Sequence, residues 1–432
     1  MQIIEFPERQ QWGQVLKRPV IDSMPLEKKV KKILDTVRSK GDKALKKYSK
    51  EFDGITPRKF QVTEKEIREA ETGVPPELKK AIGLAKANIE KFHAAQIRPV
   101  EIIETMPGVT CWRKNTAIEK IGLYIPGGTA PLFSTILMLG VPAKLAGCTE
   151  IILCSPPSSV PALGGAAGLP PAILYTASLV GVTKIFKLGG VQAIGAMAFG
   201  TETIPQVSKI FGPGNQYVTC AKQLIQQAGV AIDMPAGPSE VAIYADDTAD
   251  PAFVAADLLS QAEHGADSQV LLVVSRKQLI TPVVDEINKQ LAALPRKELA
   301  EKALENSRII LVNNETEALD LLNAYAPEHL ILACRNAETL AAGVINAGSV
   351  FIGNYSPESV GDYASGTNHV LPTNGFARSY SGVSMDSFVK KITFQKLDKE
   401  GLLNIGETVI TLAEAEGLTA HAEAVKVRLS RF

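Results

Sequence analysis

Apolar residues recur at two different spacings along the chain, and the spacing changes near residue 118. Between residues 24 and 50 they lie three or four positions apart, with Val30, Ile33, Leu34 and Val37 forming a stripe among charged residues. This spacing predicts a helical segment, and a second helix is expected from 76 to 92. We expect this N-terminal part to pack against the rest of the protein and possibly to form a dimer surface, but not to contribute catalytic groups.

From residue 118 onward, short apolar runs alternate with longer helical segments. Strands are expected at 120–125, 150–154, 184–188, 209–211 and 231–232, with helices at 132–145, 171–180, 191–199 and 215–227. Strands that alternate with helices at this spacing predict an open parallel sheet. Residues 156–170 are rich in Pro, Gly and Ser, and we expect them to form a flexible loop between two units of the sheet.

A second series of the same kind begins after residues 235–238. It comprises expected strands at 240–244, 269–274, 308–312 and 329–333, and helices at 251–264 and 276–291. The fold class is therefore α/β with two parallel-sheet domains. From about residue 390 the pattern is mostly helical with no sheet to close, which indicates an arm that must bury its apolar side on something else.

The composition limits the kinds of partner that the protein is expected to bind. Lys and Arg total 46 and Asp and Glu total 46, so the formal net charge is zero. This balance argues against nucleic acid or an anionic membrane surface as a partner. No run of about 18 apolar residues is present, and the N-terminus lacks the pattern of a secretory signal. Five scattered cysteines without a Cys-x-x-Cys pair are typical of a reducing cytoplasm.

Three glycine-containing turns follow expected strands and precede expected helices: 126–129, 189–192 and 212–215. Backbone N–H groups and a helix N-terminus at such a turn favour an anion. None of the three is a Gly-x-Gly-x-x-Gly fingerprint or a phosphate-binding P-loop, and any one could need glycine for steric reasons alone. Three of them at the carboxyl ends of strands in one sheet favour a ligand crevice.

The helix expected at 251–264 delivers two polar residues to its end, Gln261 and His264, before Gly265 stops it. Residues three apart lie on the same helix face, so both side chains can point at one object. We interpret them as half of a metal site. The alternative is a surface histidine near a charge.

The chain has only five histidines, and four of them have a carboxylate within seven positions. These four are His264, His329, His369 and His421, whereas His93 is interpreted as an ordinary helix-end histidine. Zinc accepts imidazole nitrogen and carboxylate or amide oxygen, so Gln261, His264, Asp362 and His421 form a candidate ligand set. The fold would have to bring the last two to the first two.

Glu328 and His329 place a carboxylate beside an imidazole after Pro327, at the start of an expected strand. Such a pair suits general-base chemistry, in which one group activates water and the other moves protons. Neighbouring side chains on a regular strand point to opposite faces, so this role requires an irregular strand start.

Six motifs together resemble the histidinol dehydrogenase family. They are Leu-Tyr-Ile-Pro-Gly-Gly (123–128), Gly-Pro-Gly-Asn (212–215), Asp-Met-Pro-Ala-Gly-Pro-Ser-Glu (233–240), Ser-Gln-Ala-Glu-His-Gly (260–265), Tyr-Ala-Pro-Glu-His (325–329) and Gly-Asp-Tyr-Ala-Ser-Gly-Thr-Asn-His (361–369). The resemblance covers nearly the whole chain in order and is dense from residue 120 to 390.

The resemblance implies an NAD-dependent dehydrogenase that oxidises L-histidinol to L-histidine through L-histidinaldehyde. The reaction would reduce two NAD+, use one Zn2+ per subunit and form the last step of histidine biosynthesis. Carried over to this sequence, the zinc ligands are Gln261, His264, Asp362 and His421, and the catalytic bases are Glu328 and His329. The NAD contacts are Tyr124, Gln192 and Asn215. The substrate contacts are Ser239, Gln261, His264, His329, Asp362, His369, Glu416 and His421.

The resemblance also implies a cytoplasmic homodimer in which the C-terminal segment crosses to the neighbour, so that Glu416 and His421 complete the partner's site. The expected organisation is an N-terminal arm (1–22), a first Rossmann-like domain with the metal and catalytic residues (23–120 and 238–385), a second that binds NAD (121–237), and an exchanged helical arm (386–432). No nucleic-acid or membrane partner is expected.

Two other classes of function, a metallohydrolase and a non-enzymatic binding protein, are alternatives to a dehydrogenase. A metallohydrolase could use the same Gln, His and Asp set to activate water, but it would have no use for a dinucleotide crevice. A non-enzymatic binding protein of the same fold would be expected to lack Glu328 or His329, and both are present.

Overall fold

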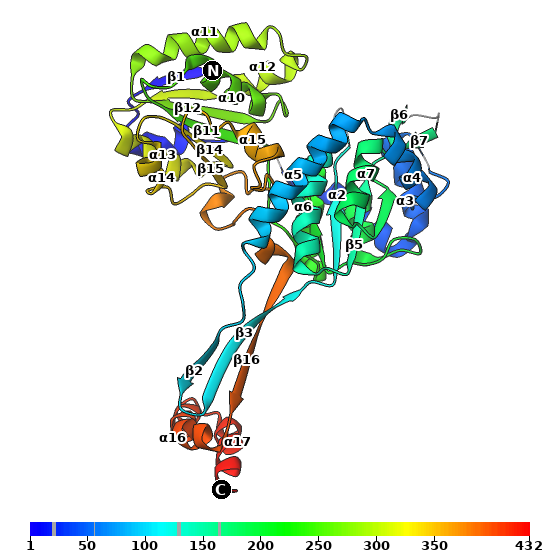
Figure 1. The fold of residues 1–432 in the computed structure, drawn as a ribbon, viewed down its shortest axis with the longest axis vertical. Helices are drawn as coiled ribbons and strands as arrows, with labels where there is room; N and C mark the ends of the chain where they lie inside the picture. The colour runs from blue at the N-terminus through cyan, green and yellow to red at the C-terminus, as the bar shows by residue number, and fades with distance from the viewer. Residues whose placement is uncertain (20–22, 56, 128–130, 163–165) are drawn as a thin grey trace.

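The computed structural model describes residues 1–19, 23–55, 57–127, 131–162 and 166–432. Two α/β bodies lie side by side, and an arm extends away from them to the C-terminus (Figure 1). The two-sheet α/β class predicted from the alternating pattern is confirmed. No helix within the described ranges is both long and apolar enough to span a membrane.

The larger sheet has six parallel strands. Their order is β1 (Gln2–Glu5), β13 (Arg308–Leu311), β12 (Gln269–Val274), β11 (Glu240–Ala245), β14 (His329–Ala333) and β15 (Ser349–Ile352). One face is covered by α10 (Pro251–Ala262), α11 (Ile280–Leu291) and α12 (Lys297–Glu305). The other face is covered by α1 (Trp12–Val15), α13 (Glu315–Tyr325) and α14 (Ala337–Ala341). Burial on both faces explains the continuous apolar runs of these strands.

The smaller sheet has five parallel strands. Their order is β10 (Ala231–Ile232), β9 (Lys209–Phe211), β4 (Lys120–Tyr124), β5 (Glu150–Ser155) and β8 (Lys184–Lys187). Its faces carry α4 (Glu64–Gly73), α5 (Pro76–Ala94), α6 (Phe133–Ala146) and α7 (Pro171–Val180) on one side. The other side carries α2 (Ser23–Lys40), α3 (Asp42–Tyr48), α8 (Gly190–Phe199) and α9 (Gln216–Ile225).

The two sheets share one topology. With β1 set aside and the strands numbered by their order within each domain, both sheets have the order 3-2-1-4-5. The order reverses between β4 and β9 in the smaller sheet and between β11 and β14 in the larger one. Such a reversal opens a crevice at the strand ends, because the connections on its two sides leave in opposite directions.

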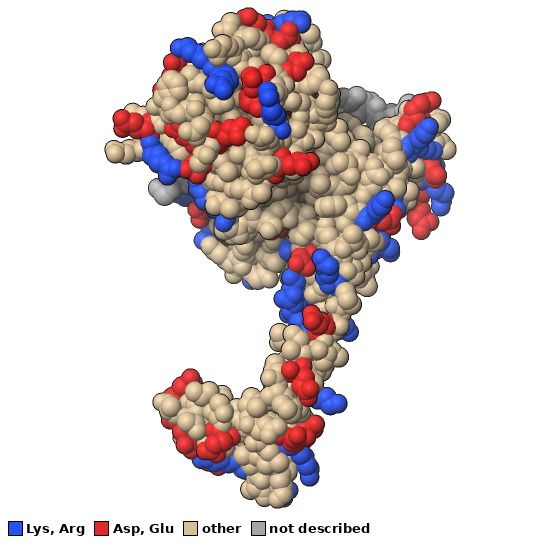
Figure 2. Space-filling view, turned by 60° about the vertical axis from the view of Figure 1, so that its left-hand side comes forward, with Lys and Arg blue, Asp and Glu red and all other residues tan. Residues whose placement is uncertain are grey.

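The arm is a three-stranded antiparallel sheet followed by two helices. Its strands are β2 (Ile102–Met106), β3 (Val109–Ala117) and β16 (Val389–Leu397), and its helices are α16 (Lys399–Ala415) and α17 (Thr419–Leu429). The short helix α15 (Glu358–Tyr363) belongs to the larger body. Figure 2 shows the arm as a narrow stalk on which Lys and Arg are interspersed with Asp and Glu. Short 3-10 or π turns lie at Arg9–Gln11, Ser49–Asp53, Gln226–Ala228, Lys277–Leu279, Phe376–Arg378 and Met385–Phe388.

The expected domain boundaries are wrong at the N-terminal end. Residues 1–22 do not begin as an arm, since β1 pairs in parallel with β13 at the edge of the larger sheet. Helices α2 to α5 pack on the smaller sheet, not on the larger one: Val30 and Val37 share a hydrophobic cluster with Tyr124 and Ile152. A helical stripe shows that one face is buried but does not show which sheet covers it.

Two further expectations about local structure are wrong. The C-terminal arm is mostly helical as expected, but it does join a sheet, because β16 pairs with β3 over nine residues from Val389↔Ala117 to Leu397↔Val109. Within 156–170, expected to be a flexible loop, β6 (Ser158–Ala162) pairs with β7 (Ala166–Gly168); residues 163–165 lie outside the described part. Both pairings are antiparallel, and the first joins segments far apart in sequence.

Candidate active site

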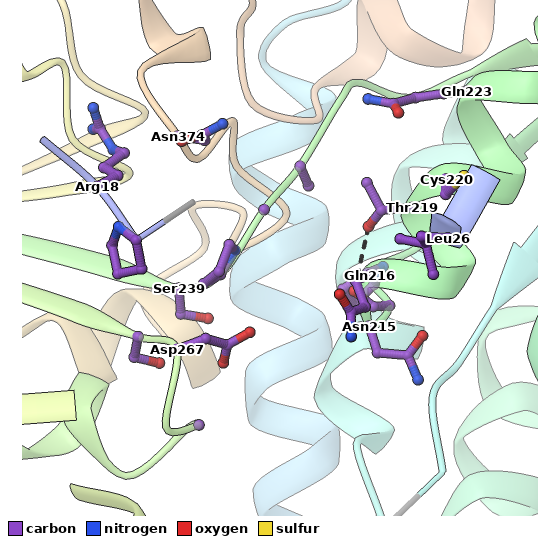
Figure 3. Close-up of a pocket in the computed structure, with 18 of the residues that line it drawn as sticks. Arg18, Leu26, Asn215, Gln216, Thr219, Cys220, Gln223, Ser239, Asp267 and Asn374 are labelled. Carbon is purple, nitrogen blue, oxygen red and sulfur yellow. Dashed lines mark hydrogen bonds between the residues drawn. The ribbon is translucent and has the colours of Figure 1, made fainter. Parts of the chain in front are cut away.

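A cavity of about 970 Å³ lies between the two bodies. It is bounded by the turn after β9 (213–216) on one side and by the segment before β11 (236–239) on the other. It therefore joins the carboxyl edge of the smaller sheet to the amino edge of the larger one. In Figure 3, Ser239, Asp267, Arg18 and Asn374 line one wall, and Asn215, Gln216 and Thr219 line the wall opposite.

Helix α10 brings the first pair of predicted ligands to this cavity. The helix ends at Ala262, two residues earlier than expected, and the His264 amide donates to the Gln261 carbonyl at 3.2 Å. Gln261 is buried, whereas His264 lines the cavity. Enclosure by the surrounding protein lowers the pKa of His264, although the Asp362 carboxylate opposes the shift. A lowered pKa favours the neutral imidazole, which is the form that binds metals.

The strand start at Glu328 is irregular, as the proposed general-base pair requires. Ala326 has a φ of 54°, a left-handed conformation that is uncommon outside glycine, and it ends α13 just before the pair. Nδ1 of His329 then lies 3.7 Å from Oε2 of Glu328. The two side chains therefore lie close together, as the proposed general-base role requires.

The backbone of one residue at the start of β11, Glu240, holds both members of the pair. The Glu240 amide donates to Glu328 Oε2 at 2.9 Å, and Nδ1 of His329 donates to the Glu240 carbonyl at 3.1 Å. Glu240 is in turn held by Arg18, whose guanidinium also donates to the Tyr325 carbonyl at 2.8 Å. Because Nδ1 is used in this way, Nε2 is the free nitrogen of His329, and it lies 3.3 Å from Asp362 Oδ1.

Burial and charge shift the pKa values of this pair. Burial raises the pKa of Glu328 to about 8, although His329 and the Glu240 amide favour its carboxylate. Burial alone would lower the pKa of His329, but the carboxylates of Glu328, Glu358 and Asp362 outweigh it and raise that pKa. The raised pKa values mean that both groups hold a proton more tightly than their exposed counterparts, and that each acts as a base only after it has lost that proton.

Asp362 and His369 come from α15 and the segment after it. Nδ1 of His369 donates to the Asp362 carbonyl at 2.8 Å, which leaves its Nε2 to pair with the Thr135 hydroxyl at 3.1 Å. Thr135 belongs to α6 of the smaller body, so His369 bridges the two bodies. The structure thus brings together six of the predicted site residues: Gln261, His264, Glu328, His329, Asp362 and His369.

Two predicted residues lie elsewhere in this chain. Glu416 and His421 are exposed and lie at the far end of the arm, in and just before α17 (Figure 1). In the described part of the chain, no group of three or more His, Cys, Asp or Glu side chains is arranged to hold a metal ion. One chain alone therefore does not assemble the predicted four-ligand set.

The remaining three ligands nevertheless fit a metal. Oε1 of Gln261 is buried and has no hydrogen-bond partner among the described residues. Unpaired buried polar atoms are costly, and a metal ion would give this oxygen a partner. An amide oxygen, an imidazole and a carboxylate are ligands that zinc accepts.

The predicted NAD contacts gather at the carboxyl edge of the smaller sheet. The Gly190 amide donates to the Tyr124 hydroxyl at 3.1 Å, and Gln192 is fully buried two residues further on with both amide atoms unpaired among the described residues. Asn215 caps α9 by accepting from the amides of residues 217 and 218. Asn215 lines the cavity, whereas Tyr124 and Gln192 do not. Of the turn at 126–129, residues 128 and 129 lie outside the described part.

The turn at 212–215 is fixed by a buried ion pair. Lys222 Nζ lies 2.5 Å from Asp233 Oδ1 and donates to the Gly212 carbonyl at 2.8 Å, and Asp233 Oδ2 accepts from the Gly212 amide at 2.8 Å. Gly212 has a φ of 126°, and a Cβ there would lie 2.0 Å from the Tyr124 carbonyl oxygen. Only glycine fits this close approach at the switch point of the sheet.

We expect Lys222→Met to destabilise the protein by about 3–5 kcal/mol, because it leaves the Asp233 charge buried and unpaired. The double variant Lys222→Met, Asp233→Asn should recover much of this loss, since it removes both charges and keeps an acceptor for Gly212. Denaturant unfolding measures both effects. Equal stabilities of wild type and Lys222→Met would show that the ion pair does not hold the turn.

Sequence reasoning missed Glu358, Glu240 and Arg18. Glu358 is 1% exposed and begins α15, one helical turn before Asp362. The spacing of four between Glu358 and Asp362 was a signal that could have marked both as facing one site. Arg18 carried no such signal, because it reaches Glu240 across 222 residues.

Two open parallel sheets that enclose a cavity lined by imidazole, carboxylate and amide groups define a two-domain α/β protein with an enzyme-like site. The profile of the family described as histidinol dehydrogenase matches residues 16–429. The chain belongs to this family.

Named relatives agree with the family over the whole length. The chain is 57% identical over 430 residues to a histidinol dehydrogenase of Bacteroides thetaiotaomicron, covering 100% of this chain and 99% of the relative. It is also 57% identical to one of Bacteroides fragilis, with 100% of both covered. A crystal structure of histidinol dehydrogenase from Elizabethkingia anophelis superposes with a TM-score of 0.96 at 54% identity, covering 100% of this chain and 98% of that one.

Proposed function

We propose that this protein oxidises L-histidinol to L-histidine through L-histidinaldehyde, with reduction of two NAD+, as the last step of histidine biosynthesis in the cytoplasm. The observation that carries the proposal is the geometry of Glu328 and His329 on the Glu240 peptide, beside Gln261, His264 and Asp362. Membership of the histidinol dehydrogenase family supports the choice of substrate.

The residues present can manage the protons of both steps. In the first, an alcohol loses one proton and one hydride to become an aldehyde, and Nε2 of His329 can accept that proton once the imidazole is in its neutral form. In the second, water adds to the aldehyde before another hydride leaves, and Glu328 can take a proton from that water. The raised pKa of about 8 makes Glu328 a stronger base than an exposed carboxylate. Ser239 lines the cavity, where it can orient the substrate, and His369 is a second proposed substrate contact.

Zinc would be held by Gln261, His264 and Asp362, with His421 of a second chain as the fourth ligand. When bound, it supplies a cation that binds the imidazole and amine of the substrate and fixes their position. NAD+ supplies the hydride acceptor and would lie along the switch point of the smaller sheet, against Tyr124, Gln192 and Asn215.

A homodimer with exchanged arms would complete the site. The arm has a very small core of its own, in which Ile410, Ala413 and Ala422 are the buried apolar residues. It also exposes Ile102, Leu403, Leu412, Leu418 and Val427. On the body, Tyr355, Val360 and Tyr363 are exposed beside Asp362. Apolar surface on both the arm and the site rim favours docking of one on the other, and this docking would bring Glu416 and His421 to the partner's site.

The proposal is tested by adding L-histidinol and NAD+ to the purified, zinc-loaded protein and following NADH and L-histidine. We expect both products to form, and we expect their formation to stop when a chelator removes the metal and to return with added zinc. A metallohydrolase with the same side chains would form no NADH, and that result would refute the proposed function.

A further inference from the structure

Arg18 is a largely buried arginine beside the site, and neither step described above uses it. Its guanidinium donates to both carboxylate oxygens of Glu240, from Nε to Oε1 and from Nη2 to Oε2, the second at 2.8 Å. The side chains of Arg18 and Glu240 are 14% and 3% exposed. A guanidinium that meets a carboxylate with two hydrogen bonds fixes the direction of its partner as well as the distance. The pair therefore holds the Glu240 side chain in one orientation.

The orientation of Glu240 matters because its backbone contacts both members of the general-base pair. Its amide donates to Glu328 Oε2 at 2.9 Å, and its carbonyl accepts from Nδ1 of His329 at 3.1 Å. On the side of β14, the paired register of β11 begins only at Val241, one residue further on. Glu240 thus lies at the margin of the strand pairing on this side. Its side-chain contacts, which include the Asn374 amide at 2.9 Å from Oε1, add to what fixes its backbone.

The same guanidinium also reaches the turn that precedes Glu328. Its Nη2 donates to the Tyr325 carbonyl at 2.8 Å and lies 3.4 Å from the Ala326 carbonyl oxygen. Its Cζ lies 4.0 Å from the centroid of the Tyr325 ring. Ala326 is the residue with a φ of 54°, and such a conformation persists only where the surrounding structure holds it. Arg18 thus contacts both backbone segments that set the positions of Glu328 and His329.

We infer that Arg18 is a positioning residue that holds the general-base pair in place by clamping the start of β11 to the turn at 325–326. The inference rests on the proposed function, in which Glu328 and His329 accept the protons of the two oxidations. A misplacement of about 1 Å in a reacting group can cost about 100-fold in rate. Release of the clamp should therefore slow catalysis although both members of the pair remain present.

The first test separates catalysis from the binding of substrates. We expect Arg18→Met to lower kcat by about 100-fold and to leave the KM values for L-histidinol and NAD+ close to those of the wild type. Arg18→Lys keeps the charge but not the fork, so it should recover only part of the loss. Arg9→Met is the matched control and should keep the wild-type kcat, because Arg9 is exposed while it pairs with Asp320 and lies over the Trp12 ring.

Two kinetic outcomes would overturn the inference. An unchanged kcat in Arg18→Met would show that the pair needs no clamp. A raised KM with an unchanged kcat would show that Arg18, which also lines the cavity, contacts the substrate instead. A double-mutant cycle on the second hydride transfer adds a third criterion. If Arg18 acts through the base, Arg18→Met should slow this step little further in a Glu328→Gln background, and equal slowing in both backgrounds would contradict the inference.

A spectroscopic measurement tests the clamp without turnover. The chain has five histidines, so NMR of the zinc-loaded protein with 15N-labelled histidine gives few imidazole signals, and His329→Gln assigns the one of interest. Nδ1 of His329 should carry a hydrogen-bonded proton in the wild type, because it faces the Glu240 carbonyl. We expect this signal to weaken or disappear in Arg18→Met and to persist in Arg9→Met. An unchanged signal together with a reduced kcat would overturn the inference.

The remaining outcomes can be told apart. If Arg18→Met does not fold, the double variant Arg18→Met, Glu240→Gln, which leaves neither charge unpaired, replaces it in each measurement, with the same expected results. Absence of NADH formation by the wild type would count against the proposed function, and the NMR comparison would still decide whether Arg18 holds the imidazole of His329 in place.

Discussion

Glu328→Gln is expected to stop the reaction after the first hydride transfer. The variant amide can still accept from the Glu240 N–H, which Glu328 Oε2 accepts at 2.9 Å, so the backbone around His329 should keep its shape. What is lost is a buried base with a pKa of about 8. Removal of a positioned general base typically costs about 10²- to 10⁴-fold, and here the cost should fall on the oxidation of the aldehyde.

Single-turnover kinetics with L-histidinol measures this effect. The expected trace shows one NADH per site formed at close to the wild-type rate, with the second forming at least a hundred times more slowly, while the zinc content is unchanged. If both hydride transfers run at the wild-type rate, Glu328 does not activate water. Loss of zinc together with activity would instead indicate that the variant has damaged the metal site.

Mixing the inactive variants His421→Ala and Glu328→Gln should restore part of the dehydrogenase activity, because the arm of one chain completes the site of the other. His421→Ala removes a ligand that the arm would deliver, and Glu328→Gln removes the base on the body. In a heterodimer with exchanged arms, the body of the first chain meets the arm of the second, so one complete site forms. Each homodimer remains defective at both of its sites.

Random pairing of the two chains in equal amounts gives half heterodimers with one intact site of two, and hence about a quarter of wild-type activity. Co-expression with two different affinity tags allows the heterodimer to be isolated and assayed alone, where half of wild-type activity is expected. If the heterodimer is as inactive as the two homodimers, then His421 and Glu328 of one site come from the same chain. That result would contradict the exchange of arms.

Local patterns were sufficient to predict most of the parallel strands and their helices. The 3.6-residue spacing located α7, α8 and α9, and the short apolar runs located β5, β11 and β12, all within about two residues. These elements are specified by neighbours in sequence, since each is long enough to show its own period. The glycine turn at 212–215 was also identified, because its steric requirement is local.

Features that depend on distant residues were not predicted. The pairing of β16 with β3 joins residues more than 270 positions apart, and β16 is largely exposed, so burial of one face does not mark it as a strand. Similarly, β1 has four residues and becomes a strand only because β13 lies beside it. Such pairings are decided by tertiary contact rather than by the propensity of the segment.

The site shows the same division. Glu328 and His329 were recognisable from their adjacency, but the Glu240 peptide that holds both was not, because it reaches them from another strand. The resemblance to a family identified residues whose spacing in sequence says nothing about their distance in space, such as Gln261 and Asp362. Glu358 lay outside both sources of information and emerged only from its contact with Ser260.

The location of the site explains why two domains are needed. Glu328 and His329 lie at the amino edge of the larger sheet, where β11 and β14 begin, and the turns proposed to bind NAD+ lie at the carboxyl edge of the smaller one. The cavity between them is lined by both bodies, and His369 links them through Thr135. A hydride donor and a hydride acceptor held on separate bodies can meet only in this cavity.

The measurement that tests the central claim most directly is the yield of NADH per L-histidinol when the substrate is limiting and NAD+ is in excess. The account predicts two NADH and one L-histidine for each L-histidinol consumed, with zinc present in the protein. One NADH per substrate with release of the aldehyde would contradict the claim that this site carries out both oxidations.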